Sequence, residues 1–151
     1  MIGVGEFNVD TSEVTDFSDF FAWCPNLKKF PSIDCSSGDS FYGMFSSCSN
    51  LETIEKITFN SGKTSVISCI FYDLSSLTNI VIEGTIKVDK NTYLLGNQPN
   101  LTVDSLMSFI NAFEDNTGEE TQYTVTIGAT NLAKLTPEQV AVATSKNILL
   151  A

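Results

Sequence analysis

The chain has 151 residues, of which 42% are hydrophobic and 17% are charged. This composition excludes a disordered chain and is sufficient for one domain with a substantial core. Eighteen acidic against eight basic residues give a net charge of −10, which repels phosphate backbones and anionic lipids, so we expect no nucleic-acid partner. No apolar run approaches the roughly 20 residues that span a bilayer, and no signal peptide is recognisable at the start, so we expect no membrane insertion.

The sequence contains no histidine. An imidazole base and a Ser-His or Cys-His nucleophile pair are therefore missing, and no phosphate-cradling or metal-hydrolase motif is present. The acidic residues are scattered, which disfavours a glycosidase pair of carboxylates. We therefore predict a protein that is not an enzyme and that needs no cofactor or metal.

One pattern recurs along the first two thirds of the chain. It reads "FFAWCPNLKKF" at 20–30, "MFSSCSNLETI" at 44–54 and "IFYDLSSLTNI" at 70–80. A leucine anchors each copy, and successive anchors are 24, 26 and 24 residues apart, at Leu27, Leu51, Leu77 and Leu101. This period lies in the range of leucine-rich repeats. It predicts a solenoid in which each turn stacks its apolar side chains on the same residues of the next turn.

Each repeat is expected to contain one short strand and one tight segment. Apolar residues follow the anchor with strand-like alternation, as at Ile80 and Ile82, so these strands should form a parallel sheet with about 4.8 Å between turns. The "MFSSC" segment suits a helical or 3₁₀ turn on the opposite side. The asparagines at 26, 50 and 100 are expected to bond backbone groups at the bend.

The cysteines are better explained by the repeat than by a disulfide framework. Cys24 and Cys48 occupy the slot that Leu74 fills in the third copy, so we expect buried thiols at all four positions, Cys24, Cys35, Cys48 and Cys69. A bridge between Cys24 and Cys48 stays open, because stacked turns bring like residues together. Trp23 is expected in the core, since its neighbours occupy inward slots.

The segment "VDTSEVTDFSDFFAWCPNL", residues 9–27, resembles the repeat D-T-S-x-V-T-x-M-S-x-M-F-x-x-C-x-x-L of BspA-like bacterial leucine-rich repeat proteins. The resemblance covers residues 7 to about 101 and loosens in the later copies, where Gln98 stands in place of Cys. It implies a right-handed solenoid on a bacterial or phage surface protein, used for adhesion or ligand binding. It implies no catalytic residue. The first repeat begins partway, so either the sequence is a piece of a longer protein or residues 1–8 form a minimal cap.

After Leu101 the pattern becomes helical. Apolar residues recur at helical spacing from Val103 to Phe113, with Thr102 as N-cap and Asp104 near the positive helix end. The acidic segment 114–120 does not match a calcium-binding loop and is expected to be a solvated loop. A strand is predicted in "QYTVTI", at 122–127.

A second helix is predicted from Thr136 to near Asn147. Thr136 and Gln139 form a capping box around Pro137 at the first helical position. "ILLA", at 148–151, reads as a last short strand. These elements would cover the apolar end of the solenoid.

Together the patterns predict an α/β fold, and the resemblance implies that its solenoid is right-handed. Residues 1–102 form a right-handed leucine-rich repeat solenoid of about four turns, the first incomplete, with a short parallel sheet. Residues 103–151 form an α/β capping module packed on the last repeat.

The predicted function is to bind a protein or glycan on the concave face of the sheet. The side chains expected on that face are Lys29, Pro31, Thr53, Glu55, Asn79, Val81 and Glu83. An ordinary solvated sheet face would look the same in sequence. The alternative function is a structural platform in a larger envelope or phage tail protein. We expect a location on the bacterial surface or outside the cell, as part of a longer protein, with a phage virion or the cytoplasm as alternatives; the oligomeric state stays open.

Overall fold

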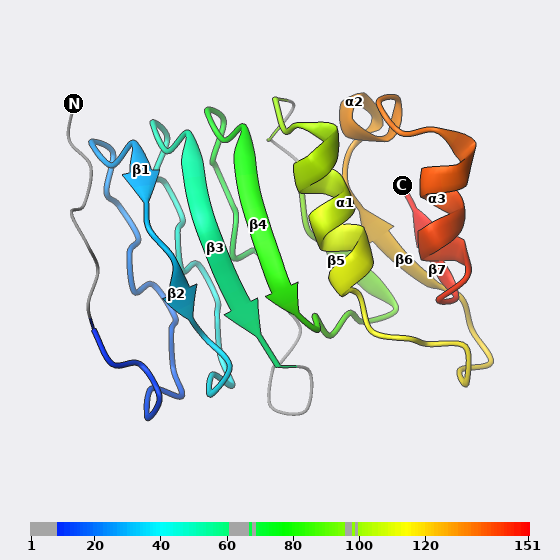
Figure 1. Cartoon of the computed structure of the whole chain (residues 1–151), viewed down its shortest axis with the longest axis horizontal. Coiled ribbons are helices and arrows are strands. Elements are labelled where there is room, and N and C mark those ends of the chain that lie inside the picture. The colour runs from blue at the N-terminus through cyan, green and yellow to red at the C-terminus, as the bar shows by residue number, and fades with distance from the viewer. Residues whose placement is uncertain (1–8, 61–66, 68, 96–97, 99) are drawn as a thin grey trace.

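The computed structural model describes residues 9–60, 67, 69–95, 98 and 100–151 (Figure 1). It is a mixed α/β structure with two small parallel sheets. In chain order its elements are β1 (Lys29–Phe30), β2 (Ile33–Asp34), β3 (Thr53–Phe59), β4 (Asn79–Gly84), β5 (Asn91–Tyr93), α1 (Val103–Ala112), β6 (Tyr123–Thr126), α2 (Ala129–Leu132), α3 (Pro137–Thr144) and β7 (Ile148–Leu150). Residues 1–8, which the sequence suggests as a cap, lie outside the described residues.

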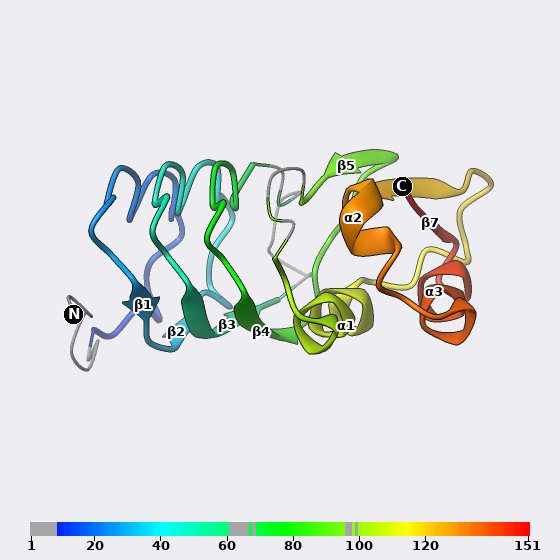
Figure 2. The same ribbon diagram turned by 90° about the horizontal axis from the view of Figure 1, so that it is seen from above.

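The first sheet joins equivalent residues of successive repeats. β1 and β2 both pair with β3, and β4 pairs with the other edge of β3, all in parallel. Lys29 lies beside Thr53, and Thr53 lies beside Asn79. The chain therefore winds once between neighbouring strands, and we call each such repeat a winding. Figure 2 shows the strands along one side of the windings and the tight segments along the opposite side.

Apolar side chains fill the space between these two sides. The four anchor leucines are buried, as are the apolar strand residues at Phe30, Ile54 and Ile80. Like residues stack on like: the rings of Phe17 and Phe41 are 5.5 Å apart and nearly parallel. One winding alone could not remove these side chains from water, because each is covered by its counterpart in the next winding.

The tight segments at 17–24, 41–48 and 69–74 are series of turns. They contain the bonds between residues three apart that are expected of a 3₁₀ turn, but they do not continue into a helix. Each contains two residues with left-handed backbone at fixed positions: Asp19, Gly43 and Cys69 at the first position, and Trp23, Ser47 and Asp73 at the second. A left-handed residue interrupts a right-handed helical run. Bonds within a segment, such as Ser46 N–H to Gly43 O at 2.8 Å, are joined by bonds between windings, as where Trp23 N–H donates to Ser46 O at 2.8 Å.

Two predictions from the sequence, the burial of Trp23 and of Cys24, are wrong. Trp23 is 78% exposed, because its left-handed backbone turns the side chain away from the core. Cys24 is exposed as well, whereas Cys48 in the next winding is buried. The first winding lies at one end of the described structure, so a neighbour covers its slots from one side only. Cys69 is half-buried, which leaves Cys35 and Cys48 as the two buried thiols among four free ones.

The slot of Cys48 has a specific polar role. Its thiol donates to the carbonyl oxygen of Phe21 in the preceding winding, at 3.1 Å. In the fourth winding Gln98 fills the same slot, and its amide donates to the equivalent carbonyl oxygen, that of Phe71. Gln98 therefore replaces the cysteine in function, although in sequence it departs from the repeat.

Two of the three repeat asparagines bond backbone groups, as predicted. Asn50 Nδ2 donates to Pro25 O at 2.7 Å, and Asn100 Nδ2 donates to Ser75 O at 3.3 Å. Both bonds reach the preceding winding, and not a group within the same bend. They therefore add to the bonds that hold neighbouring windings together.

In the fourth winding, α1 lies where the earlier windings have a strand of the first sheet. The ladder of the first sheet continues one step further, with Thr102 N–H donating to Thr78 O at 2.9 Å, and the chain then turns into α1. The predicted N-cap is confirmed, since Thr102 Oγ1 accepts from Ser105 N at 3.3 Å. Two serine hydroxyls of α1 then bond the open edge of β4: Ile80 N–H donates to Ser105 Oγ at 3.0 Å, and Ile82 N–H donates to Ser108 Oγ at 2.5 Å. The edge of the sheet is thus satisfied by side chains.

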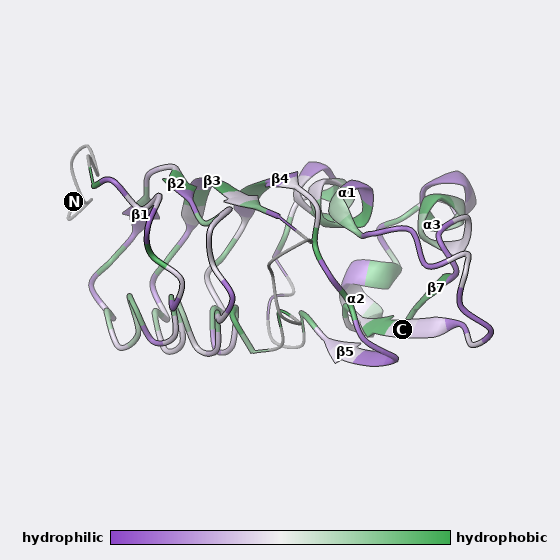
Figure 3. Cartoon of the chain, turned by 90° about the horizontal axis from the view of Figure 1, so that it is seen from below, coloured by the Kyte–Doolittle hydropathy of each residue, from purple (hydrophilic) through white to green (hydrophobic). Residues whose placement is uncertain are grey.

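The second sheet has the strand order β5-β6-β7. The sequence predicted β6 and β7 but neither β5 nor α2. Because β5 lies before residue 102 and pairs with β6, this sheet draws on both predicted units. α1 and α3 pack over one face of this second sheet, on the side of the molecule where the first sheet lies (Figure 2). The outward sides of both helices are hydrophilic (Figure 3).

The C-terminal elements are tied to the last winding by polar groups. In α2 the buried Asn131 donates from Nδ2 to Gln98 O at 3.1 Å, and Lys134 Nζ donates to Leu101 O at 2.8 Å. The capping box of α3 is present as predicted, but this helix ends at Thr144, before Asn147. Lys146 Nζ donates to Phe113 O at 2.6 Å and caps the last turn of α1. Among the described residues, no helix has the length and apolar character needed to cross a bilayer.

The edge bond from α1 gives a stability prediction. Ser105→Ala leaves the Ile80 N–H without its acceptor in a buried position. We expect a loss of about 1–3 kcal/mol in the free energy of unfolding, measured by urea denaturation. The same substitution at the exposed Ser32 is the control and should change it by less than about 0.5 kcal/mol. Equal stabilities of the two variants would show that the bond contributes nothing.

Thiol labelling tests the burial of the cysteines. Burial raises the pKa of the Cys35 thiol to about 12 and also raises the pKa of Cys48, so neither forms a thiolate readily. With a disulfide reagent at about pH 8, we expect Cys24 to react first, Cys69 more slowly, and the other two only after unfolding. Cys24→Ser should remove the fast phase alone. Fast labelling of all four thiols in the folded protein would contradict the structure.

Candidate functional site

The candidate binding surface is the solvent-exposed side of the β1–β4 sheet, which we call the strand face. Parallel pairing places Lys29, Thr53 and Asn79 in one row across β1, β3 and β4. Alternation along β4 keeps Ile80 and Ile82 inside and turns Val81 and Glu83 outward. The predicted side chains therefore reach this face because of strand periodicity and the register between windings.

A shallow hollow of about 180 Å³ lies at one end of the row, where the sheet meets α1. Four predicted residues line it: Thr53, Glu55, Asn79 and Val81. The other wall comes from the start of α1 and includes Thr102 and Asp104. The hollow thus combines hydroxyls, an amide and two carboxylates with one exposed apolar side chain.

Local bonds hold parts of this hollow in place. Asn79 Nδ2 donates to Thr78 Oγ1 at 2.8 Å, and Thr78 Oγ1 donates to Glu52 O at 3.0 Å. The amide of Asn79 is therefore oriented by a hydrogen bond before any ligand arrives. A fixed group loses less conformational entropy on binding.

The remaining predicted residues lie outside the hollow. Lys29 belongs to the row, and Pro31 lies half-buried between β1 and β2. Glu83 lies toward the other end of β4, where it pairs with Lys56 at 3.1 Å. A second pair, Lys28 with Glu52 at 3.8 Å, flanks the row. Much of the charge on this face is therefore matched within the protein.

The sequence did not identify the α1 side of the hollow. It identified Thr102 and Asp104 as helix-start residues and said nothing about their position beside β4. The repeat period could have located this side of the hollow. Thr102 directly follows the fourth anchor leucine, and the equivalent residues of earlier windings are Lys28, Glu52 and Thr78. Extending the repeat by that one residue places the start of the helix next to the strand row.

A larger hollow of about 560 Å³ lies between the chain leading to β5 and the acidic segment 114–120. The segment 114–120, predicted to be a solvated loop, is only partly exposed to solvent. Asn116 is buried, and Asn147 Nδ2 donates to its carbonyl oxygen at 3.1 Å. Glu114 is half-buried, and burial raises the pKa of its carboxyl group, with a smaller contribution from Glu119. Among the described residues, no group of three or more His, Cys, Asp or Glu side chains is arranged to hold a metal ion.

In comparisons with protein-family models, curated proteins and solved structures, no match to this chain was found. The resemblance to BspA-like repeats therefore rests on the residues of this sequence alone.

The raised pKa of Glu114 predicts a pH-dependent stability effect. Below its ordinary pKa of 4.5 the carboxyl is protonated whether the chain is folded or not, and it has no effect. Above the raised pKa it is ionised in both states, and burial then disfavours the folded one, so stability falls as pH rises through this window. Glu114→Gln should therefore raise the melting temperature at about pH 7 and leave it unchanged at about pH 3.5.

The matched control is Glu120→Gln, at an exposed position in the same segment. It should show no such pH-dependent gain. A gain for Glu114→Gln that is equal at both pH values would mean that packing or hydrogen bonding, and not ionisation, explains the change.

Proposed function

We propose that this chain is a non-enzymatic binding or adhesion module that holds a protein or glycan ligand on its strand face. The observation that carries the proposal is the row of Lys29, Thr53 and Asn79, which ends in a hollow with an oriented amide. A surface with side chains at regular intervals suits an extended ligand.

The chemistry of the hollow favours a ligand with many hydroxyl or amide groups. Glu55 and Asp104 accept hydrogen bonds, and Thr53 and Asn79 both donate and accept. Val81, which is 47% exposed and lines the hollow, offers apolar contact. Two carboxylates disfavour an anionic group here, so a neutral glycan or a polar peptide segment fits best.

We also propose that the fold is a right-handed leucine-rich repeat solenoid like that of the BspA-like proteins. Parallel strands one repeat apart, stacked phenylalanines and asparagines that bond the preceding winding support it. The resemblance then favours a place on the bacterial surface or outside the cell, within a longer protein.

The alternative is a structural platform in a larger envelope or phage tail assembly. One observation favours it: Lys28 pairs with Glu52 and Lys56 with Glu83, so these charges need no external partner. A rigid face with internally matched charge could serve only as a spacer.

Binding measurements separate the two functions. The purified chain is applied to a glycan array, to mucin and to matrix proteins, together with a strand-face variant that carries alanine at Lys29, Thr53, Glu55 and Asn79. We expect saturable binding that weakens at least about tenfold in the variant, because polar contacts of about 1 kcal/mol each are lost.

The control variant carries alanine at residues of the same chemical kinds, placed on exposed positions elsewhere: Lys90, Thr121, Glu120 and Gln122. It should bind like the unmodified chain. Equal losses in both variants would place the ligand elsewhere or indicate a charge effect only. Absence of binding to every surface would favour the platform.

A further inference from the structure

The side of the molecule opposite the strand face carries a strip of exposed tyrosines. We call this side the turn face; it comprises the tight segments at 17–24, 41–48 and 69–74 together with β5, which continues the same layer in Figure 2. Tyr42, Tyr72 and Tyr93 are 66%, 53% and 48% exposed. They come from three successive windings. Single exposed tyrosines are common on proteins, but a contiguous row is a recognised feature of binding surfaces.

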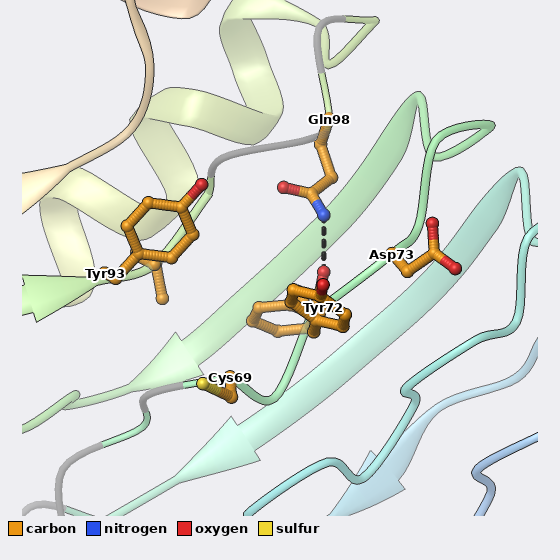
Figure 4. A pocket seen from close by; sticks show the side chains of 7 residues that line it. Cys69, Tyr72, Asp73, Tyr93 and Gln98 are labelled. Atoms are coloured by element: carbon orange, nitrogen blue, oxygen red, sulfur yellow. Dashed lines mark hydrogen bonds between the residues drawn. The ribbon is translucent and has the colours of Figure 1, made fainter.

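Two neighbouring hollows connect the three rings. The first, of about 150 Å³, is lined by Tyr42 and Tyr72 with Asp19, Gly43, Ser46 and Cys69. The second has room for about one water molecule and is lined by Tyr72 and Tyr93 with Asp73 and Gln98. Figure 4 shows Tyr72, Tyr93 and Gln98 around it, with Asp73 next to Tyr72. Tyr72 borders both hollows and makes the strip continuous.

The backbone holds this strip in a defined shape. Asp19 N–H donates to Tyr42 O at 2.9 Å, and Ser47 N–H donates to Tyr72 O at 3.3 Å, so both tyrosines are anchored to their neighbouring windings. Gly43 has left-handed backbone, and a Cβ there would overlap Asp19 Oδ1. The missing side chain at this position leaves room for the carboxylate beside the hollow.

The charge of the turn face is one-sided. Asp19 and Asp73 flank the tyrosines. The lysines described in the first three windings are Lys28, Lys29 and Lys56, all on the strands or directly before them, and the sequence contains no arginine. The described tight segments are therefore aromatic and acidic and contain no lysine, on a chain with a net charge of −10; the exposed Lys90 directly precedes β5 at the end of the strip.

We propose that the turn face binds a basic, extended peptide segment of a partner protein. Guanidinium and ammonium groups are attracted to the faces of tyrosine rings, and carboxylates beside the rings add charge attraction. An extended chain places alternate side chains on one side, about 7 Å apart, so a segment with repeated basic residues presents several cations along the strip. An anionic ligand is repelled by both carboxylates. This surface is separate from the strand face and does not depend on the function proposed for it.

The test uses the full chain and fluorescence anisotropy of a labelled peptide in which arginine and serine alternate. We expect saturable binding that weakens as salt concentration rises, and none for the peptide with glutamate in place of arginine. Tyr72→Ala should weaken binding about two- to thirtyfold, as expected for loss of one cation–π contact, and Tyr72→Phe should restore most of it because the ring is kept. Asp19→Asn should weaken binding mainly at low salt.

The control is the strand-face variant, which should bind the arginine peptide like the unmodified chain. Far-UV circular dichroism checks that each variant folds, as expected for exposed side chains. The proposal is overturned if the arginine peptide does not bind, if the glutamate peptide binds equally, or if Tyr72→Ala has no effect. It is also overturned if a neutral oligosaccharide binds, is lost with Tyr72→Ala and displaces the peptide, because the strip would then be a sugar-stacking platform.

Discussion

The contact between neighbouring windings is the interaction on which the rest of this structure depends. Within any one of the first three windings, the described backbone forms only single-turn hydrogen bonds, such as Leu51 N–H to Cys48 O, and no helix or sheet ladder. Backbone bonds and stacked apolar side chains both run to the next winding, as with Phe17 on Phe41. Every winding is therefore stabilised by its neighbours.

This dependence explains what could be predicted from the sequence. The repeat of leucine anchors predicted the parallel strands and their register, and cap residues such as Thr102 and Thr136 located both long helices. The direction of a side chain in a turn was not predictable, because it depends on the sign of φ. Among the left-handed positions of the described tight segments, only Gly43 is a glycine, while Asp19, Cys69 and Trp23 adopt the same backbone without that signal. Because nothing in the sequence marks Trp23 as left-handed, its side chain was predicted to lie in the core, but it is exposed.

The candidate site was predictable only in part. Strand alternation placed Thr53, Glu55, Asn79 and Val81 on one face, but the hollow exists because α1 begins beside β4, and no local pattern in the sequence reveals that position. β5 escaped prediction because the buried residue among its three is the polar Thr92, so it shows no apolar alternation. The tyrosines of the turn face occupy different places in their repeats, so alignment of the repeats does not reveal the strip that they form.

The first sheet ends, and the hollow of the strand face forms, at the same place, where α1 lies against β4. A parallel sheet that stops leaves one edge with unpaired N–H and C=O groups, which invites pairing with another chain. Here α1 covers that edge, with Ser105 and Ser108 bonding β4. A helix is wider than a strand and cannot continue the flat row of side chains, so a hollow opens where one replaces the other. The helix that protects the sheet edge therefore also forms one wall of the hollow.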